Sequence, residues 1–400
     1  MVVRVRAWLL VAAAIVPRAA LAQPDSSPDS PPAPTPAPTP APRTVAKEHG
    51  TPAYKPPAFT WEPFGFLRLQ YSFVQNDPNI AFVGRDDGFQ LQNARVGMRG
   101  RLDRRAAFVV SFDGAVDERE QINVPEGKLG VGLRDAFVDV ALGDGLPWDA
   151  ASPKLVARAG FFQTWIDPEG LVPDTSRELV DRPLESRGIR ATEGFQTQGL
   201  TPGRSLGAAL RIEPPVQPFG IGGGLELAVQ NGADEFASNN DNDKPAVSAA
   251  GLVRTRNGSF VVGGVRYNPR TAGDLPFRRD EDDLQATAGL RVVAGPVAFG
   301  GAFVVVHTTF PTTGGPSQNA VGGHGQLMVT TGDVTFGYRF AILDPSSLIT
   351  TDRVMEHTVG AVLAVPRYRM RFQAQLVYTA EQGERELSNS RAQLAAEVAL

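Results

Sequence analysis

Hydrophobic and polar residues alternate along residues 88–114, which read GFQLQNARVGMRGRLDRRAAFVVSFDG. In the first half, Val96 and Met98 alternate with Arg95 and Arg99, and a second apolar alternation follows a short polar turn. Side chains point to opposite faces along a strand, so this stretch predicts a hairpin with one apolar and one charged face. A soluble antiparallel sheet has the same pattern, so the hairpin alone leaves the fold open.

The same alternation recurs to the last residue and predicts sixteen strands of roughly ten residues, the length that a tilted strand needs to cross a bilayer. The predicted strands are 64–75, the two arms of 88–114, 132–142, 154–163, 205–212, 221–230, 247–254, 259–267, 283–293, 297–307, 323–330, 333–341, 353–363, 367–379 and 390–400.

The connections between these strands alternate between short turns and long polar loops. Asn257-Gly258 is a strong hairpin signal, and Gly332 marks another tight turn. Outer-membrane barrels have short turns at one end and long loops at the other, and closure pairs every backbone group. The sequence therefore predicts an all-β fold, a transmembrane antiparallel β-barrel of about sixteen strands.

The N-terminus has the features of an export signal. Arg4 and Arg6 precede an apolar run over residues 7–16, and an A-x-A cleavage motif ends at Ala22. The apolar run is too short to favour an uncleaved membrane anchor. We therefore expect residues 1–22 to be a signal peptide and the protein to reach the outer membrane of a Gram-negative cell.

Residues 23–60 are rich in Pro, Ala, Thr and Ser. This composition predicts an extended, disordered linker that acts as a spacer rather than a recognition motif. The domain prediction is therefore a signal peptide over 1–22, a Pro-rich linker over 23–60 and an outer-membrane β-barrel over 61–400.

Almost all of the positive charge comes from arginine, which binds oxyanions through two parallel hydrogen bonds and stays protonated. The net charge of -4, without a basic tail, gives no indication of nucleic-acid binding. The absence of cysteine excludes a disulfide scaffold and thiolate metal sites. The lysines are Lys47, Lys55, Lys128, Lys154 and Lys244.

Arginines recur on the predicted inward faces of the strands. A sixteen-stranded barrel encloses an aqueous channel, and an arginine-rich wall would concentrate anions there. An alternative remains open, in which arginine–acid pairs only brace the wall. The predicted pore-lining residues are Arg68, Arg95, Arg99, Arg101, Arg158, Arg266, Arg339, Arg369 and Arg371.

The longest connection covers residues 164–204, and long loops inside compact folds usually have a function. Folded into the lumen, this loop would form the narrowest point of the pore; the alternative is an external cap. Its predicted constriction residues are Arg177, Arg182, Arg187 and Arg190.

Several segments in the same order resemble the phosphate-selective porin O and P family over residues 62–400. They are GFQLQNARVGMRGRL (88–102), LRDAFVDV (133–140), VARAGFFQTWIDPEGL (156–171), ELVDRPL (178–184), LELAVQNGAD (225–234), the Asn-Asp-Lys sequence at 242–244, and YRMRFQAQLVY (368–378).

This resemblance implies a sixteen-stranded barrel, usually a homotrimer, with anion-conducting pores and a third loop folded inward. Members of the family with phosphate selectivity use an arginine ladder and a lysine cluster. The present chain has almost no lysine at strand positions, so no lysine cluster is carried over. It also ends in Leu400, where outer-membrane barrels commonly end in Phe.

The remaining polar residues do not form a known catalytic or metal motif. The histidines His49, His307, His324 and His357 are scattered and lack a metal-ligand spacing. Acidic runs at the predicted loop tips could bind Ca²⁺ or simply be solvated. We expect no cofactor and no enzymatic activity.

The sequence therefore predicts an outer-membrane porin for ion transport by passive diffusion of small hydrophilic solutes, preferring anions such as phosphate. Its expected partners are outer-membrane lipid, small anions and further copies of itself in a homotrimer. Two alternatives are a structural or adhesive barrel with a plugged lumen and an outer-membrane hydrolase barrel. Conductance would separate a porin from a plugged barrel.

Overall fold

The computed structural model describes residues 59–80, 87–102, 105–117, 129–142, 154–189, 197–213, 220–232, 240, 242–272, 278–382 and 386–400. The predicted signal peptide, the linker up to residue 58 and Arg190 of the predicted constriction set lie outside the described residues. The proposed division at residues 22 and 60 therefore stays a prediction.

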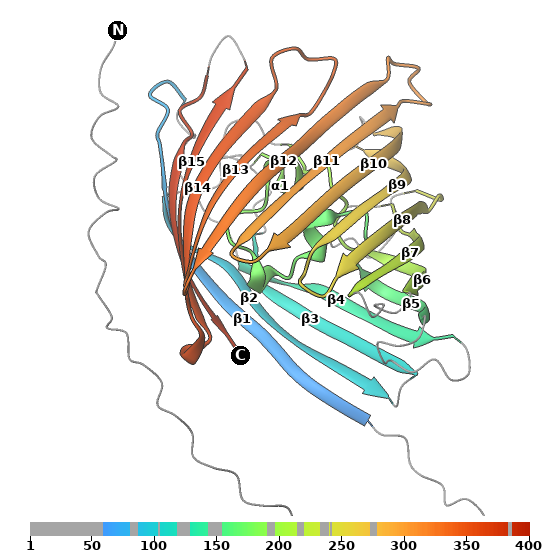
Figure 1. Ribbon diagram of the computed structural model, residues 1–400. Coiled ribbons are helices and arrows are strands. Elements are labelled where there is room, and N and C mark those ends of the chain that lie inside the picture. Colours follow the sequence, from blue (N-terminus) through green and yellow to red (C-terminus); the bar gives the residue numbers. More distant parts are fainter. Residues whose placement is uncertain are drawn as a thin grey trace, which may run out of the picture. The chain divides into compact units, whose positions relative to one another are not determined.

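Sixteen antiparallel strands close into one barrel in which each strand pairs with its neighbours in the chain and β1 pairs with β16 (Figure 1). This confirms the predicted fold class. The strands are β1 (Phe59–Val74), β2 (Gly88–Leu102), β3 (Ala106–Asp117), β4 (Leu129–Ala141), β5 (Lys154–Phe162), β6 (Ser205–Glu213), β7 (Ile221–Gln230), β8 (Ala246–Thr255), β9 (Phe260–Ala272), β10 (Arg279–Ala294), β11 (Val297–Thr309), β12 (Gln318–Thr331), β13 (Val334–Asp344), β14 (Val354–Val365), β15 (Met370–Glu381) and β16 (Arg391–Ala399).

Several strands extend beyond their predicted bounds, at the long-loop ends and also at the start of β1, which begins at Phe59 rather than 64. β7 has the predicted bounds, whereas β10 begins at Arg279 rather than 283 and β12 begins at Gln318 rather than 323. Backbone pairing continues there through polar residues, for example Asp282 with Thr309. The apolar alternation marks only the part of each strand that faces an apolar surrounding, so it underestimates strand length.

The turn before β15 corrects one prediction. Pro366 begins a short 3₁₀ turn (η4, Pro366–Tyr368), and the amide of Arg369 closes it onto the Pro366 carbonyl at 3.0 Å. Arg369 has a φ of 52° and is exposed. The prediction of Arg369 on an inward strand face is therefore wrong, because the proline-initiated turn delays the strand to Met370.

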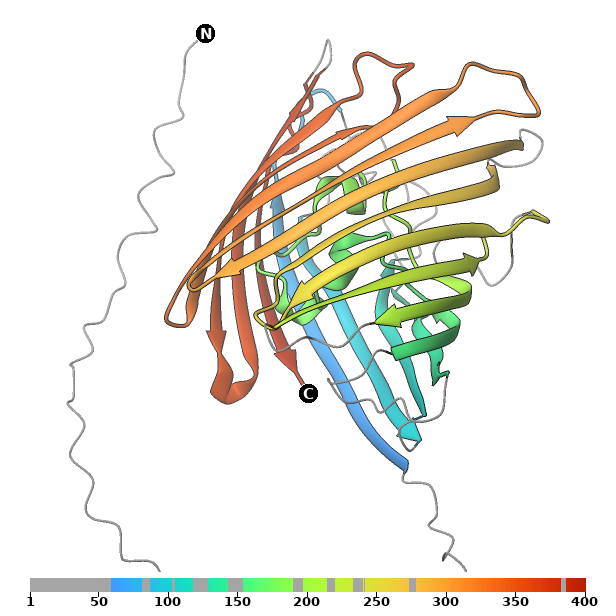
Figure 2. The same ribbon diagram turned by 45° about the vertical axis from the view of Figure 1, so that its right-hand side comes forward.

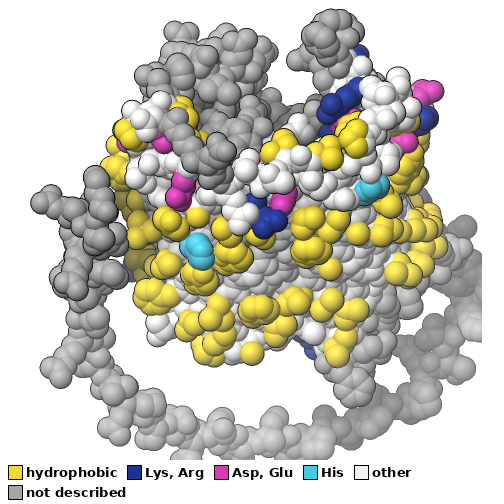
Figure 3. Space-filling view, turned by 90° about the horizontal axis from the view of Figure 1, so that it is seen from above, with side chains coloured by type: hydrophobic (Ala, Val, Ile, Leu, Met, Phe, Trp, Pro, Cys, Tyr) yellow, Lys and Arg dark blue, Asp and Glu magenta, His cyan; other side chains and the backbone are white. Residues whose placement is uncertain are grey.

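The wall of the barrel has its apolar side outward. In β1, Leu67 and Leu69 are 47% and 43% exposed, whereas the alternate residues Arg68 and Gln70 are 1% and 2% exposed. Figure 3 shows hydrophobic side chains over a broad band of the surface, with the charged side chains of this face to one side of the band. This distribution matches a barrel surrounded by hydrocarbon. None of the described helices is long and apolar enough to cross a membrane.

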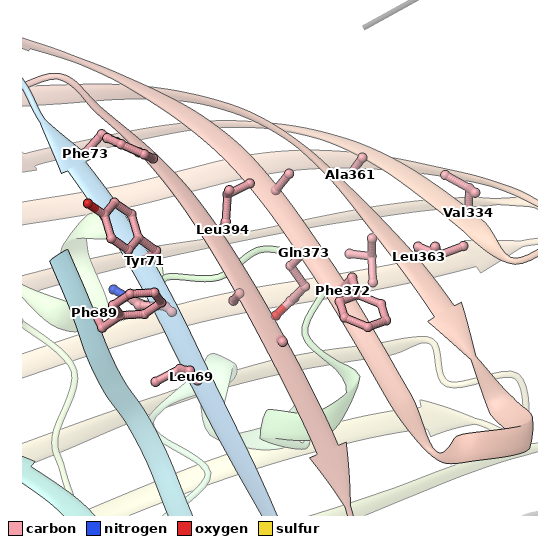
Figure 4. Close-up of a pocket in the computed structure, with 15 residues that line it drawn as sticks. Leu69, Tyr71, Phe73, Phe89, Val334, Ala361, Leu363, Phe372, Gln373 and Leu394 are labelled. Atoms are coloured by element: carbon pink, nitrogen blue, oxygen red, sulfur yellow. The ribbon is translucent and has the colours of Figure 1, made fainter. Parts of the chain in front are cut away.

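A concave apolar groove of about 630 Å³ lies on the outside of the wall across β1, β2 and β13–β16 (Figure 4). Tyr71 is the centre of an aromatic group in it, with ring centroids 4.6 Å from Phe73 and 4.8 Å from Phe89. The groove is lined mainly by apolar side chains and lies on the outer side of the wall, so it is separate from the polar site described below.

Because the outward side chains face hydrocarbon, a charge introduced at the middle of a strand should lower the stability of the barrel. Phe303 is 52% exposed near the centre of β11. We expect Phe303→Arg to lower the free energy of unfolding in lipid vesicles by about 2–4 kcal/mol, because it places a guanidinium in hydrocarbon. Phe303→Leu is the matched control, and urea unfolding followed by gel mobility is the measurement. Equal stability of the two variants would contradict a lipid-facing position.

Candidate functional site

The segment between β5 and β6 folds inside the barrel, surrounded by strands in both views (Figures 1 and 2). We call its described residues, 163–189 and 197–204, the lumen loop. It contains two 3₁₀ turns, η1 (Pro168–Leu171) and η2 (Asp174–Ser176), and one helical turn, α1 (Leu184–Arg187). The loop is thus located where the sequence placed it, and its role as a constriction stays a prediction.

Two apolar clusters fasten the lumen loop to the wall. Trp165 and Ile166 pack on Ala250, Leu252 and Val262 of β8 and β9. A second cluster joins the helical turn and its surroundings to β13 and β14 and contains Leu184, Ile189, Leu200, Ala341, Leu343 and Val354. Burying these side chains stabilises the inward position of the loop.

Glycines on the inner wall make room for this close packing. A Cβ atom at Gly264 would lie 2.5 Å from Cδ1 of Ile166, and one at Gly322 would lie 2.5 Å from Cβ of Glu185. Real Cβ atoms do not approach so closely, so any larger residue at these wall positions would displace the loop.

Arginines that were predicted to line the pore also bind the lumen loop. Arg68 is paired with Glu397, and its Nη2 donates to the carbonyl of Asp174 at 2.7 Å. Arg371 lies 3.5 Å from Glu397 and donates to the carbonyl of Thr175. These two guanidinium groups therefore satisfy the loop backbone and share the single carboxylate of Glu397.

A second group of charges holds the loop from the adjacent part of the wall, on β13, β14 and β16. Arg339 donates to the carbonyl of Asp181 at 3.0 Å, and Arg391 lies 3.2 Å from the Asp181 carboxylate. Glu356 accepts from Arg391 at 3.0 Å and from Arg187 of the loop at 2.6 Å. Arg187, a predicted constriction residue, is therefore neutralised by the wall.

Asp174 is the acid on which the loop arginines converge. It lies 2.6 Å from Arg95 of β2, 2.6 Å from Arg177 and 3.8 Å from Arg182. Burial alone would raise the pKa of Asp174, but these guanidinium groups hold it well below its usual value. Burial also lowers the pKa of Arg177 to about 10, so this guanidinium remains charged at neutral pH.

Asp167, in the same loop, has a pKa that is shifted in the opposite direction from that of Asp174. Its side chain is fully buried, and burial raises its pKa to about 6 in spite of Arg182 at 3.8 Å. One carboxylate oxygen accepts from the amide of Glu169 at 3.0 Å, and the other accepts from the Gln163 side chain. The loop thus contains one carboxyl that is ionised throughout the neutral range and one that titrates near pH 6.

The remaining predicted pore arginines are mostly paired with acids on adjacent strands. Arg158 donates two hydrogen bonds of 2.7 Å to Asp139 and lies 3.7 Å above the Phe137 ring. Arg99 and Glu62 form an exposed pair at 2.9 Å near the short-turn end.

Arg101 is exposed as well and lies at the end of β2, next to the short turn between β2 and β3.

A cavity of about 640 Å³, which we call the vestibule, lies between the lumen loop and the long-loop ends of β9–β12. Four arginines line it. Arg187, Arg204 and Arg270 are each paired with a carboxylate. Within the described part of the chain, Arg266 makes no hydrogen bond and no ion pair, although the carboxylate of Asp283 acts on it electrostatically. The vestibule therefore holds a guanidinium without a direct partner.

His324 is an inward-facing residue whose contacts the sequence did not indicate. Its Nδ1 lies 2.5 Å from Glu185 of α1, and its Nε2 lies 3.4 Å from Glu169 of η1. The other described histidines of the barrel have other partners: His307 with Asn319, and His357 with Tyr338. Because the two glutamates are far from β12 in the chain, only the folded loop brings them to the histidine.

Among the described residues, no group of histidines and acids could hold a metal ion. The acidic run at the start of β10 is occupied by other side chains: Asp280 accepts from Thr271 and Thr312, and Glu281 is paired with Arg270. This run therefore does not present a free set of Ca²⁺ ligands.

The fold is that of porins and related outer-membrane channels of known structure. The outer-membrane channel DcaP of Acinetobacter baumannii is 11% identical with a TM-score of 0.57, covering 86% of this chain and 97% of that chain. An anion-selective porin from Comamonas acidovorans is 14% identical with a TM-score of 0.54, covering 86% and 100%. OmpF of Salmonella typhi, in complex with daunomycin, is 11% identical with a TM-score of 0.55, covering 85% and 97%.

No protein-family model and no curated protein matches the chain. At these identities the structural similarity establishes a general porin-like barrel and does not single out the phosphate-selective family.

The contacts of His324 with Glu185 and Glu169 predict that it protects the backbone of the lumen loop from hydrogen exchange. We expect His324→Ala to accelerate backbone hydrogen exchange in residues 184–189 by roughly 5- to 100-fold, because Glu185 and Glu169 lose a buried partner. His307→Ala, on the adjacent strand and facing outward, is the matched control. Unchanged exchange in the His324 variant would show that the apolar cluster alone holds α1.

The two loop carboxyls predict opposite pH dependences of stability. The raised pKa of Asp167 contributes stability that is present below pH 3.8 and is lost as the pH rises through about 6, by about 3 kcal/mol in total. Asp167→Asn should remove this loss. The lowered pKa of Asp174 contributes stability above pH 3.8 that disappears in acid, so Asp174→Asn should be destabilised at pH 7.

Urea unfolding between pH 3 and pH 8 measures both effects. A decline of stability with rising pH that is as steep in Asp167→Asn as in the unmodified protein, or steeper, would contradict the assignment of that carboxyl.

Proposed function

We propose that the protein is an outer-membrane porin that passes small hydrophilic solutes by passive diffusion and prefers anions. The apolar outer wall, the polar inner wall and the porin-like barrel support this function. We further propose that the N-terminal segment directs export and that the chain assembles as a homotrimer. An apolar outer face such as the groove in Figure 4 is the kind of surface that such an assembly would use.

The observation that carries the anion preference is the guanidinium of Arg266, which makes no ion pair within the described residues of the barrel. Most of the other predicted pore arginines have a carboxylate within ion-pair distance, which weakens their fields. An unpaired guanidinium at the mouth of an aqueous lumen raises the local concentration of anions. The preference is therefore assigned to the vestibule rather than to a continuous ladder.

Phosphate remains one candidate anion, on the basis of the sequence resemblance. The chain lacks the lysine cluster of the phosphate-selective family, and the loop arginines of this chain have acidic partners. A general preference for small anions is consistent with both facts.

One observation favours a second candidate, a barrel whose lumen is closed by the loop. The loop packs on β8 and β9 through Trp165 and Ile166, and it binds β1 and β15 on the far side of the closed ring, so it extends across the lumen. Such a barrel would be structural or adhesive and would not conduct.

Planar-bilayer recording in a KCl gradient tests the proposal. We expect a reversal potential on the anion side. Arg266→Gln should bring this potential closer to zero, because the variant removes the unpaired guanidinium. Arg266→Lys keeps the charge and is the matched control.

A folded barrel without conductance would overturn the porin function in favour of the closed barrel. A cation-side potential in the unmodified protein would overturn the anion preference.

A further inference from the structure

The vestibule wall has a polar half and an apolar half within one row of residues. Arg266, Gln285, Val306 and Ala320 lie opposite one another on the consecutive strands β9, β10, β11 and β12. All four line the vestibule. Adjacent strands are about 4.8 Å apart, so Val306 and Ala320 lie about 10 and 14 Å along the wall from Arg266.

The polar half contains hydrogen-bonding groups that have no partner among the described residues. The guanidinium of Arg266 is one of them. Asn268, two residues further along β9, is 6% exposed, and its Oδ1 accepts no hydrogen bond from the described residues. A buried polar group without a partner costs free energy, so a ligand that satisfies it gains affinity.

The nearest acid to this half is already engaged. Asp283 lies 2.9 Å from Arg270 and accepts a hydrogen bond of 2.6 Å from Thr308. The charge of Asp283 is therefore divided between Arg270 and Arg266, and the guanidinium of Arg266 keeps its hydrogen-bond donors without a partner in the described residues.

The apolar half faces the same cavity. Val306 and Ala320 project from β11 and β12, and Leu200 of the lumen loop and Pro345 lie beside them. An inorganic anion would gain nothing from this surface, whereas an apolar group of a ligand would leave water by contacting it.

We propose that the vestibule binds small organic monocarboxylates that carry a compact apolar body. The carboxylate would pair with Arg266, whose planar guanidinium matches carboxylate geometry, and the body would lie over Gln285 toward Val306 and Ala320. A cavity of about 640 Å³ accommodates a molecule with a single ring. This assignment rests on the proposed anion preference and names the class of anion.

Benzoate is a suitable probe, with acetate and inorganic phosphate as comparisons. We expect benzoate on the long-loop side to reduce the chloride current at concentrations at least tenfold lower than acetate or phosphate. Arg266→Gln should abolish the difference. Val306→Thr, which has nearly the same shape but is polar, should weaken the block by benzoate several-fold, whereas the outward-facing control Val305→Thr should not change it.

Equilibrium dialysis of labelled benzoate against the folded barrel in detergent tests the same site without any current. Binding that requires Arg266 and Val306 supports the assignment, even in a barrel that does not conduct. An anion-selective current with equal block by benzoate and acetate would overturn it and leave the porin function in place. Absence of saturable benzoate binding would likewise overturn it.

Discussion

Closure of the barrel between β1 and β16 is the constraint on which the interior depends. A wall in hydrocarbon must pair all its backbone groups, and only a closed sheet does so. The closing register sets Arg68 opposite Glu397, although 329 residues separate them in the chain. This ion pair supports the lumen loop through the Asp174 carbonyl. The same pairing that seals the wall therefore creates one of the anchors of the loop.

The lumen loop and the arginines of the wall satisfy each other. A loop with little regular structure leaves carbonyl groups without partners, and these groups need donors once they are away from bulk water. Arg339 and Arg371 supply such donors to Asp181 and Thr175. In return, loop carboxylates such as Asp174 neutralise wall charges such as Arg95. Many inward arginines are thus explained by the requirements of the loop, without reference to permeating ions.

The period-two pattern was sufficient to predict the strands, their faces and the barrel, because each of these depends on residues close in sequence. The geometry of turns was harder to predict, as Arg369 shows, because it was decided by Pro366, which directly follows the apolar residues at the end of β14. The sequence also contains a signal for where the loop lies against the wall, namely glycines at inward strand positions. Glycines such as Gly264 and Gly322 recur on inward faces where the loop lies against the wall.

The distinction between Arg158 and Arg266 could not be made from alternation alone, because both are inward arginines on predicted strands. Register separates them. Arg158 lies opposite Asp139, whereas Arg266 lies between the neutral residues Ser248 and Gln285. The tight Asn-Gly turn between β8 and β9 fixes the alignment of Arg266 with Ser248. The number of inward arginines is therefore a weak guide to selectivity, and the charge of their cross-strand neighbours is the more informative quantity.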